Sequence, residues 1–321
     1  MNRRQFIGGF GGLVAVSALP GGALADKRED AVAFFGKRGK FERLCLAYQH
    51  IHVGLEKPFS ILHISDTHLT AAYPNEPEVK QKISRIRTET FGGQQENALV
   101  SSLEWAKSNV DYVLHTGDLI DWQSEANFDL VRKHYGGIAL GTMGNHEYSP
   151  SMWLSEEKES RDDAWRAKTA DRLSAAYPFD ISFHAQAVNG VNFVMIDDVY
   201  GGVSAKQVER FAAEVKKGLP IVLCMHVPFF TPDILMAHEK FWRGQGKKFR
   251  KALPEVKGDY KVQLEDPVTK DFIAYLKGEK LLKGILAGHL HITVQERFSP
   301  TAMEYVVGGN FMYHGQEVLF T

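Results

Sequence analysis

The chain has 321 residues, of which 44% are hydrophobic and 24% are charged, and this composition excludes a disordered chain and a polytopic membrane protein. A chain of about 300 residues buries roughly 75% of its unfolded surface, so folding requires no disulfide or structural metal, and the length allows one or two domains. Residues 1–25 hold Arg3, Arg4 and no acid; without them, 36 basic and 39 acidic side chains give a net charge of −3, so we expect no stable nucleic-acid partner.

The first residues have the pattern of an export signal. Asn-Arg-Arg-Gln-Phe-Ile at 2–7 precedes an apolar stretch at 8–19, which glycines interrupt, and small residues at 23–25. The adjacent arginines and the weakly apolar stretch resemble a twin-arginine (Tat) signal over residues 1–25. This resemblance implies the Tat translocase as a partner during export, and a periplasmic or other extracytoplasmic protein after cleavage near Ala25. A permanent membrane anchor needs about 20 continuous apolar residues, so we expect none.

A charged, glycine-containing linker is predicted at 26–40, and one domain is predicted at 41–321. In this domain, short apolar runs predict strands, and apolar residues at helical spacing predict helices. The expected strands lie at 59–64, 112–114, 138–140, 191–196, 221–225, 285–287, 292–298, 304–307 and 317–320, and two clear helices lie at 96–107 and 204–216. Strands that alternate with helices indicate an α/β protein, and the last three strands indicate an antiparallel finish.

The segment at about 228–279 interrupts this alternation. It is rich in Phe, Trp, Lys, Arg and Pro and is too long for an ordinary connection, so we expect a cap or lid over a site. Its basic run at 247–251 is typical of a solvated face, with phosphate contact as the alternative. The only two cysteines, Cys45 and Cys224, lack metal-ligand spacing; Cys224 lies in an apolar run and is expected to be a small buried residue.

Polar side chains follow five of the predicted strands. Ser-Asp-Thr-His, Gly-Asp-Leu-Ile-Asp and Gly-Asn-His-Glu come after the first three, and a single His and Gly-His-Leu-His come after two later ones. In α/β proteins, the carboxyl ends of strands border the ligand-binding crevice. The candidate metal ligands at this edge are Asp66, His68, Asp118, Asn145, His226, His289 and His291. They are too far apart in sequence for one local element to assemble them.

Imidazoles combined with carboxylate oxygens favour borderline divalent ions such as Mn, Fe, Zn or Co. Seven ligands exceed the needs of one such ion and suit two ions that share a carboxylate. Each fragment alone is weak, because Asp-x-His is more often a hydrogen-bonded surface pair and a lone histidine on an apolar strand is more often a packed core residue. All five fragments occur together and in this order along the chain, and this joint occurrence is what indicates a metal site.

In that order, the fragments resemble the signature of the calcineurin-like metallophosphoesterase superfamily: DxH, GDxxD, GNH with a following acid, a lone His and GHxH. The match runs from Asp66 to His291. The resemblance implies an α/β fold, a four-layer αββα sandwich with two mixed β-sheets. It also implies two divalent metal ions. The resemblance assigns Asp66, His68 and His291 to the first ion, Asn145, His226 and His289 to the second, and Asp118 to both.

The same resemblance implies a phosphoric ester hydrolase in which a metal-bridging hydroxide attacks phosphorus in line with the leaving oxygen. A small-molecule phosphoester is the expected substrate, as a phosphodiester or as a phosphatase substrate. His146 is the expected general acid, and Asp121 is expected to accept a hydrogen bond from its other ring nitrogen. The alternative is a non-catalytic metal-binding or scaffold protein that retains the fold.

Four other polar residues near the motifs are expected to be structural. His63 and His115 lie within predicted strands and should pack there or support the ligands. Asp197 and Asp198 follow an apolar run and are expected to cap a strand end.

Overall fold

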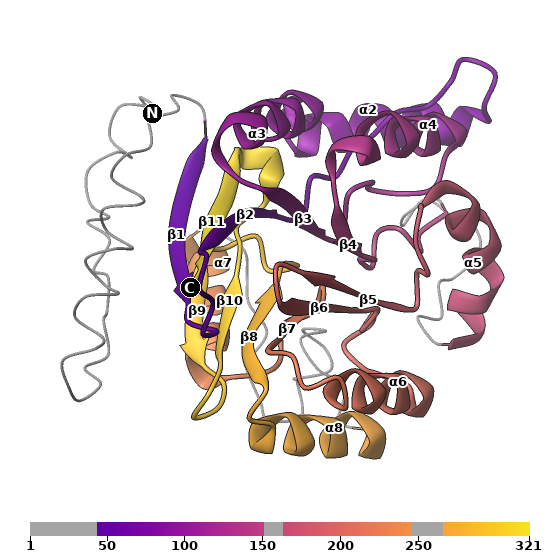
Figure 1. Cartoon of the computed structure of the whole chain (residues 1–321). Helices are drawn as coiled ribbons and strands as arrows, with labels where there is room; N and C mark the ends of the chain where they lie inside the picture. Colours follow the sequence, from indigo (N-terminus) through magenta and orange to yellow (C-terminus); the bar gives the residue numbers. More distant parts are fainter. Residues whose placement is uncertain (1–43, 151–162, 245–265) are drawn as a thin grey trace. The chain divides into compact units, whose positions relative to one another are not determined.

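Two mixed β-sheets lie at the centre of the fold (Figure 1). The computed structural model describes residues 44–150, 163–244 and 266–321, which all belong to the compact unit Lys40–Thr321. No helix in these three ranges is long and apolar enough to cross a membrane.

The predicted export signal at 1–25 and the predicted linker at 26–40 lie outside the described residues. Both therefore stay predictions.

The first sheet has the strand order β1-β11-β2-β3-β4. Its strands are β1 (Cys45–Ile51), β11 (His314–Phe320), β2 (Phe59–Ile64), β3 (Tyr112–Thr116) and β4 (Leu140–Thr142). Strand β11 pairs parallel with β1 and antiparallel with β2, while β2, β3 and β4 run parallel. The carboxyl ends of these three parallel strands therefore meet at one edge.

The second sheet has the strand order β5-β6-β7-β8-β10-β9. Its strands are β5 (Phe183–Val188), β6 (Val191–Ile196), β7 (Ile221–Cys224), β8 (Leu282–Ala287), β10 (Met303–Val306) and β9 (Val294–Arg297). The four inner strands run parallel, and β5 and β9 pair antiparallel at the two edges. Both sheets are therefore mixed.

The described helices lie outside the two sheets (Figure 1). They are α2 (Glu78–Thr90), α3 (Gln95–Asn109), α4 (Glu125–His134), α5 (Asp163–Ala176), α6 (Ala205–Val215), α7 (Pro232–Gly244) and α8 (Pro267–Gly278), with short 3-10 turns η2 (Tyr135–Gly137) and η5 (Asn310–Met312). Ser204 and Gln207 form a capping box at the start of α6. At α8, the Asp266 side chain accepts the Thr269 N–H, and Pro267 occupies the first turn.

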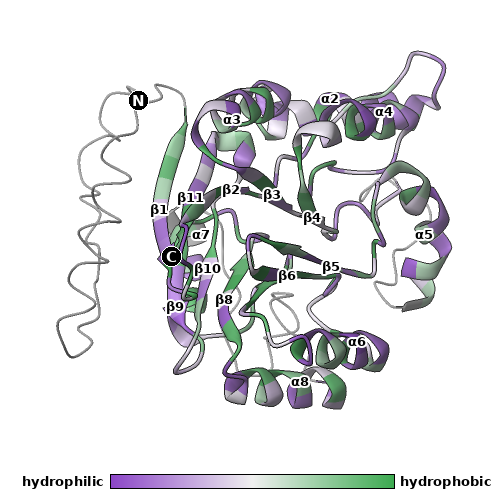
Figure 2. Ribbon diagram, viewed as in Figure 1, coloured by the Kyte–Doolittle hydropathy of each residue, from purple (hydrophilic) through white to green (hydrophobic). Residues whose placement is uncertain are grey.

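Alternating side chains divide the core into layers. On β2, Ile61 packs between the sheets, whereas Leu62 and Ile64 pack toward the helices that cover the first sheet. On β7, Val222 and Cys224 face the first sheet, and Leu223 faces α6 and α8. Figure 2 shows β2 and β6 as mainly hydrophobic, whereas α6 and α8 carry both kinds of residue. This two-residue period explains a helix–sheet–sheet–helix arrangement, which confirms the predicted four-layer αββα fold class.

The predicted elements agree with the structure where hydrophobic patterning is strong. The third predicted strand is displaced, because η2 occupies 135–137 and β4 begins only at Leu140. Strands β1 and β5 were not predicted; both lie at sheet edges, where half-exposed polar residues dilute the apolar signal. Of the three strands expected to form an antiparallel finish, β9 and β10 pair antiparallel with each other, whereas β11 joins the first sheet.

The predicted cap at about 228–279 is only partly described, because residues 245–265, with the basic run at 247–251, lie outside the described residues. Helix α8 falls within the predicted cap, yet its Phe272 and Leu276 are fully buried against the second sheet. This part of the segment is a covering helix of the domain, because its apolar face is needed to bury the outer face of β7 and β8.

Candidate metal centre

All seven candidate ligands lie just beyond the carboxyl ends of parallel strands. Asp66 and His68 follow β2, Asp118 follows β3, and Asn145 follows β4. From the second sheet, His226 follows β7, and His289 and His291 follow β8. The backbone N–H of His289 donates to Asp66 Oδ2 at 2.9 Å, which joins the two sheets at this edge. The structure thus brings side chains from both sheets together.

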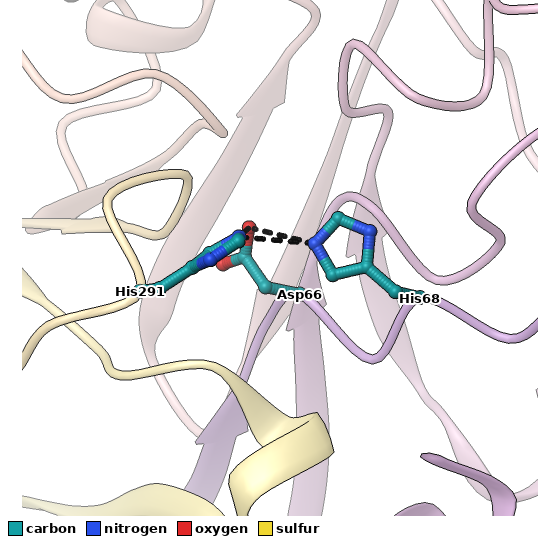
Figure 3. Close-up of side chains that lie close together, drawn as sticks. All are labelled: Asp66, His68 and His291. Carbon is teal, nitrogen blue, oxygen red and sulfur yellow. Dashed lines mark hydrogen bonds and ion pairs between the residues drawn. The ribbon is translucent and has the colours of Figure 1, made fainter. Parts of the chain in front are cut away.

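Asp66, His68 and His291 form the first group (Figure 3). The Asp66 Oδ1 atom lies 3.3 Å from His291 Nε2 and 3.9 Å from His68 Nε2, and the two Nε2 atoms lie 3.0 Å apart. Figure 3 shows the three side chains pointing toward one another, Asp66 and His68 from the segment after β2 and His291 from the segment after β8. Three donor atoms this close can bind one ion.

Asp118, His226 and His289 form the second group. The His226 Nε2 atom lies 3.3 Å from Asp118 Oδ2 and 3.2 Å from His289 Nδ1. The same Asp118 oxygen lies 3.8 Å from His68 Nε2. Asp118 therefore lies between the two groups, as a shared ligand must.

Two buried oxygen atoms in this region have no donor at hydrogen-bond geometry among the described residues. They are Asn145 Oδ1 and Asp66 Oδ1, and the latter has ion-pair contacts with His291 and His68. A buried oxygen without a partner costs about 1–3 kcal/mol, and a divalent cation would remove that cost. Together with the imidazole and carboxylate donors, these oxygens fit a pair of borderline divalent ions.

The backbone at the candidate ligands adopts a conformation that L residues rarely use. Of the seven described non-glycine residues with positive φ, five are candidate ligands. They are Asp66 (55°), His68 (54°), Asp118 (55°), His289 (68°) and His291 (58°). Each such residue costs of order 1 kcal/mol, which the surrounding fold must offset. The left-handed turns redirect the chain at the strand ends, where the side chains converge.

Charge pairing sets the protonation states of the carboxylates. Burial alone would raise the pKa of Asp66 and Asp118, but neighbouring imidazoles, His291 for the former and His226 for the latter, bring both pKa values below the ordinary range. Burial lowers the pKa of His68 to about 4 and that of His289 to about 3. At neutral pH these two imidazoles are neutral, which is the form that binds a cation.

Two histidines have the opposite shift. Burial would lower the pKa of His226, but the charge of Asp118 raises it to about 10. Burial would also lower the pKa of His146, yet Asp118 and Asp121 raise it to about 9. Without bound metal, both rings therefore carry a proton at neutral pH, and His226 must release its proton to become a ligand.

His146 lies beside the two groups and remains partly accessible, with its side chain 17% exposed. Its Nδ1 atom lies 2.9 Å from both the backbone oxygen and the Oδ1 atom of Asp121, and its Nε2 atom lies 3.9 Å from Asp118 Oδ2. Asp121 thus occupies the position expected of an acceptor for the ring. His146 also falls within coordination range of His68 and Asp118.

Two residues that the sequence analysis did not single out organise this region. Arg87 of α2 contacts both carboxylate oxygens of Asp121 and shares that carboxylate with His68 and His146. Glu147 accepts backbone N–H groups from Asp118 (2.9 Å), Leu119 (2.7 Å) and Gly144 (2.9 Å). Only Glu147 carried a sequence signal, as the acid after Gly-Asn-His; nothing in the sequence around Arg87 marks it.

The four residues expected to be structural do support the fold. His63 Nε2 lies 2.8 Å from Thr116 Oγ1, and His115 Nε2 lies 2.9 Å from Thr67 Oγ1, both in the buried interior. Asp197 accepts the Tyr148 hydroxyl at 2.6 Å and the Val199 N–H at 3.1 Å. The packed-residue interpretation of the two histidines and the capping interpretation of Asp197 are confirmed.

The Asp198 side chain contacts the segment after β7. Its Oδ1 atom accepts the N–H groups of His226 (3.0 Å) and Val227 (3.2 Å), while Glu304 Oε1 accepts the Phe229 N–H at 2.7 Å. Two buried carboxyl groups thus hold the loop that carries His226.

The chain has an α/β fold with two groups of His and Asp side chains that could each hold a metal ion. Comparison with known proteins gives the family. The family described as calcineurin-like phosphoesterase matches residues 59–293, so the chain belongs to the calcineurin-like phosphoesterase family.

The solved structures that are similar to the chain include a phosphatase and a nucleotidase. A dimetal phosphatase from Danio rerio is 12% identical, with 81% of this chain and 91% of that chain covered and a TM-score of 0.45. A 5'-nucleotidase from Candida albicans SC5314 is 13% identical, with 83% and 47% covered and a TM-score of 0.37. None of the curated proteins matches this sequence.

Substitution Gly144→Ala should impair metal binding, because a Cβ there would lie 2.2 Å from Asp118 Oδ1 and 2.3 Å from Asp118 N. Relief of this clash must move the shared carboxylate, so we expect the affinity for both ions to fall by about 10-fold or more. Titration with Mn²⁺ checks this. Gly136→Ala is the matched control, since its Cβ would meet no atom within 4 Å. Unchanged affinity in Gly144→Ala would contradict the central position of Asp118.

Substitution Glu304→Gln should flatten the pH dependence of stability. Burial, helped by Asp198 and Glu296 and opposed by the Phe229 N–H, raises the pKa of Glu304 to about 8. Between about pH 5 and 8 this group is protonated in the folded protein and ionised in the unfolded chain, so its contribution to the free energy of unfolding falls as pH rises. Over this range, we expect the free energy of unfolding of the variant to rise relative to that of wild type by up to about 1.4 kcal/mol for each pH unit. Urea unfolding in EDTA measures this, and parallel curves would refute it.

Proposed function

We propose that the protein is a dinuclear-metal-dependent phosphoric ester hydrolase that acts on small phosphoesters, as a phosphodiesterase or a phosphatase. The observation that carries this proposal is the buried Asp118 carboxylate, which lies 3.3 Å from His226 and 3.8 Å from His68, members of two separate groups of donors. Membership of the calcineurin-like phosphoesterase family supports the reaction class.

The donor groups suggest how two ions would be held. Asp66, His68 and His291 would hold the first and Asn145, His226 and His289 the second, with Asp118 shared. Bound Mn, Fe, Zn or Co ions would supply Lewis acidity, which activates water as a nucleophile and neutralises the phosphoryl oxygens.

The protein's own residues would orient the substrate and move a proton. Because Asp121 engages Nδ1 of His146, Nε2 is the ring nitrogen that lies toward Asp118 and the donor groups. Without bound metal, Asp118 and Asp121 raise the pKa of His146 to about 9 against the effect of burial. The contact of Nδ1 with Asp121 does not involve a proposed metal ligand, so it would still favour a protonated ring in the metal-loaded enzyme. His146 can therefore donate that proton to the leaving oxygen as the ester bond breaks, which typically contributes about 10² to 10⁴ in rate.

Elemental analysis of the purified protein, followed by hydrolysis assays on a panel of mono- and diesters, tests the proposed function. We expect two divalent ions per chain and activity that is lost in EDTA and restored by metal. Asp118→Asn keeps the shape of the side chain but removes its shared charge, so it should lose both metal and turnover. Full activity in Asp118→Asn would contradict the proposal, and a metal-loaded but inactive wild type would favour a binding or scaffold role.

His146→Asn separates a proton donor from a metal ligand. If His146 is the general acid, kcat should fall by about 10² or more while metal content stays at the wild-type level. The effect should be smaller for esters whose leaving group is acidic, such as nitrophenyl esters, because such a group needs less protonation. Measurement of metal content beside kcat decides the role: loss of metal in this variant would assign His146 to the ligands.

A further inference from the structure

We infer that Arg87 and Phe91, at the carboxyl end of α2, are positioning residues that hold the His68 imidazole from its edge and from its face so that its Nε2 atom is presented to the first ion. This inference rests on the proposed metal-binding role of His68. Neither residue belongs to a signature fragment.

Arg87 fixes the carboxylate that holds His68. The Arg87 side chain is 9% exposed, and its guanidinium contacts the fully buried Asp121 as a fork: Nε donates to Oδ2, and Nη2 donates to Oδ1 at 2.7 Å. A two-point contact of this kind sets the plane of the carboxylate as well as compensating its charge. Arg87 therefore fixes the orientation of the Asp121 carboxylate independently of the histidines that this carboxylate contacts.

The oriented carboxylate then selects which nitrogen of His68 is available. Asp121 Oδ1 lies 2.9 Å from His68 Nδ1, which donates its proton there. The other nitrogen, Nε2, faces Asp66 and His291, and Figure 3 shows it as the nitrogen joined to both by dashed lines. A second hydrogen bond of this type fixes the tautomer and orientation of a metal-binding imidazole.

Phe91 holds the same ring from its face. The Phe91 and His68 rings are stacked, with centroids 4.3 Å apart and planes 10° apart. Phe91 also contacts Arg87, whose Cζ atom lies 4.7 Å from the Phe91 centroid, and Phe311, whose ring centroid lies 4.7 Å away. Positions 87 and 91 are one helical turn apart, so one face of α2 delivers both residues. A stacked pair contributes about 0.5–1.5 kcal/mol, enough to restrict rotation of the His68 ring.

These contacts engage Phe91 with the guanidinium and the imidazole, so it acts through His68 and is a poor platform for a substrate ring.

Arg87, Asp121 and Phe91, here called the His68 clamp, support a ligand of the first ion and none of the proposed ligands of the second. His226 is fixed independently, by Nδ1 at 2.7 Å from the Thr116 backbone oxygen. Loss of the clamp should therefore weaken the first ion selectively.

The test is Mn²⁺ titration of the full chain by calorimetry, with Arg87→Met, Arg87→Lys and Phe91→Leu compared with wild type. We expect one of two binding steps to weaken by about 10- to 100-fold in Arg87→Met and by less in Phe91→Leu. His68→Ala should weaken the same step, which identifies it. Arg87→Lys should recover part of the loss, because lysine restores the charge but not the fork.

Arg132→Met is the matched control, because Arg132 also makes two contacts with one carboxylate, that of Asp129, but on the surface. It should bind both ions with wild-type affinity.

Removal of Arg87 leaves a buried carboxylate uncompensated and can unfold the chain. The double variant Arg87→Met/Asp121→Asn removes that charge, and Phe91→Leu leaves the ion pair intact, so both remain informative. Wild-type affinities in these variants, or equal weakening of both steps, would overturn the inference. A wild-type chain that binds no divalent metal would instead refute the proposed function itself.

Discussion

The geometry of the candidate metal centre depends on one buried carboxylate, Asp118, which lies after β3 among imidazoles from both sheets. Its Oδ2 atom lies 3.3 Å from His226 and 3.8 Å from His68. Burial of a carboxylate is costly unless positive charge or hydrogen bonds compensate it. Here the imidazoles lower the pKa of Asp118 far enough to keep it ionised, and the same charge raises the pKa of His226 to about 10. In the proposed enzyme, two cations would replace those protons as the compensating charge.

The folding free energy supports a local geometry that is unfavourable by itself. Five candidate ligands have left-handed backbone, and Asp66 and Asn145 each bury an oxygen without a donor at hydrogen-bond geometry among the described residues. These costs, of order a few kcal/mol together, are offset by three apolar layers that fix the strands on which the ligands lie. Preorganised donors of this kind spend little free energy on rearrangement when a ligand binds.

Around the candidate ligands lies a set of groups that act only on the ligands or their backbone. Glu147 fastens the turn that carries Asp118, Asp198 fastens the loop that carries His226, and Arg87 with Asp121 fastens the His68 ring. Each is a buried charged or titratable group with several partners, as required for a stable interior. The contacts of these groups join segments that are distant in sequence, so the geometry of the centre is a property of the whole domain.

The sequence by itself determined the α/β class, the central buried strands and the order of the polar fragments from Asp66 to His291. These follow from short-range patterns: apolar runs that must be buried, and polar residues placed directly after them. The tertiary structure alone decided the edge strands β1 and β5, the place of α8 in an outer layer, and the contacts of Arg87, Glu147 and Asp198. Edge strands lack a strong apolar pattern, and the partner of β1 lies at the other end of the chain. Arg87 and Asp121 meet because the fold brings the carboxyl end of α2 to the loop that follows β3. Charge pairing over such a distance in sequence depends on the path of the backbone, which no local pattern of side chains contains.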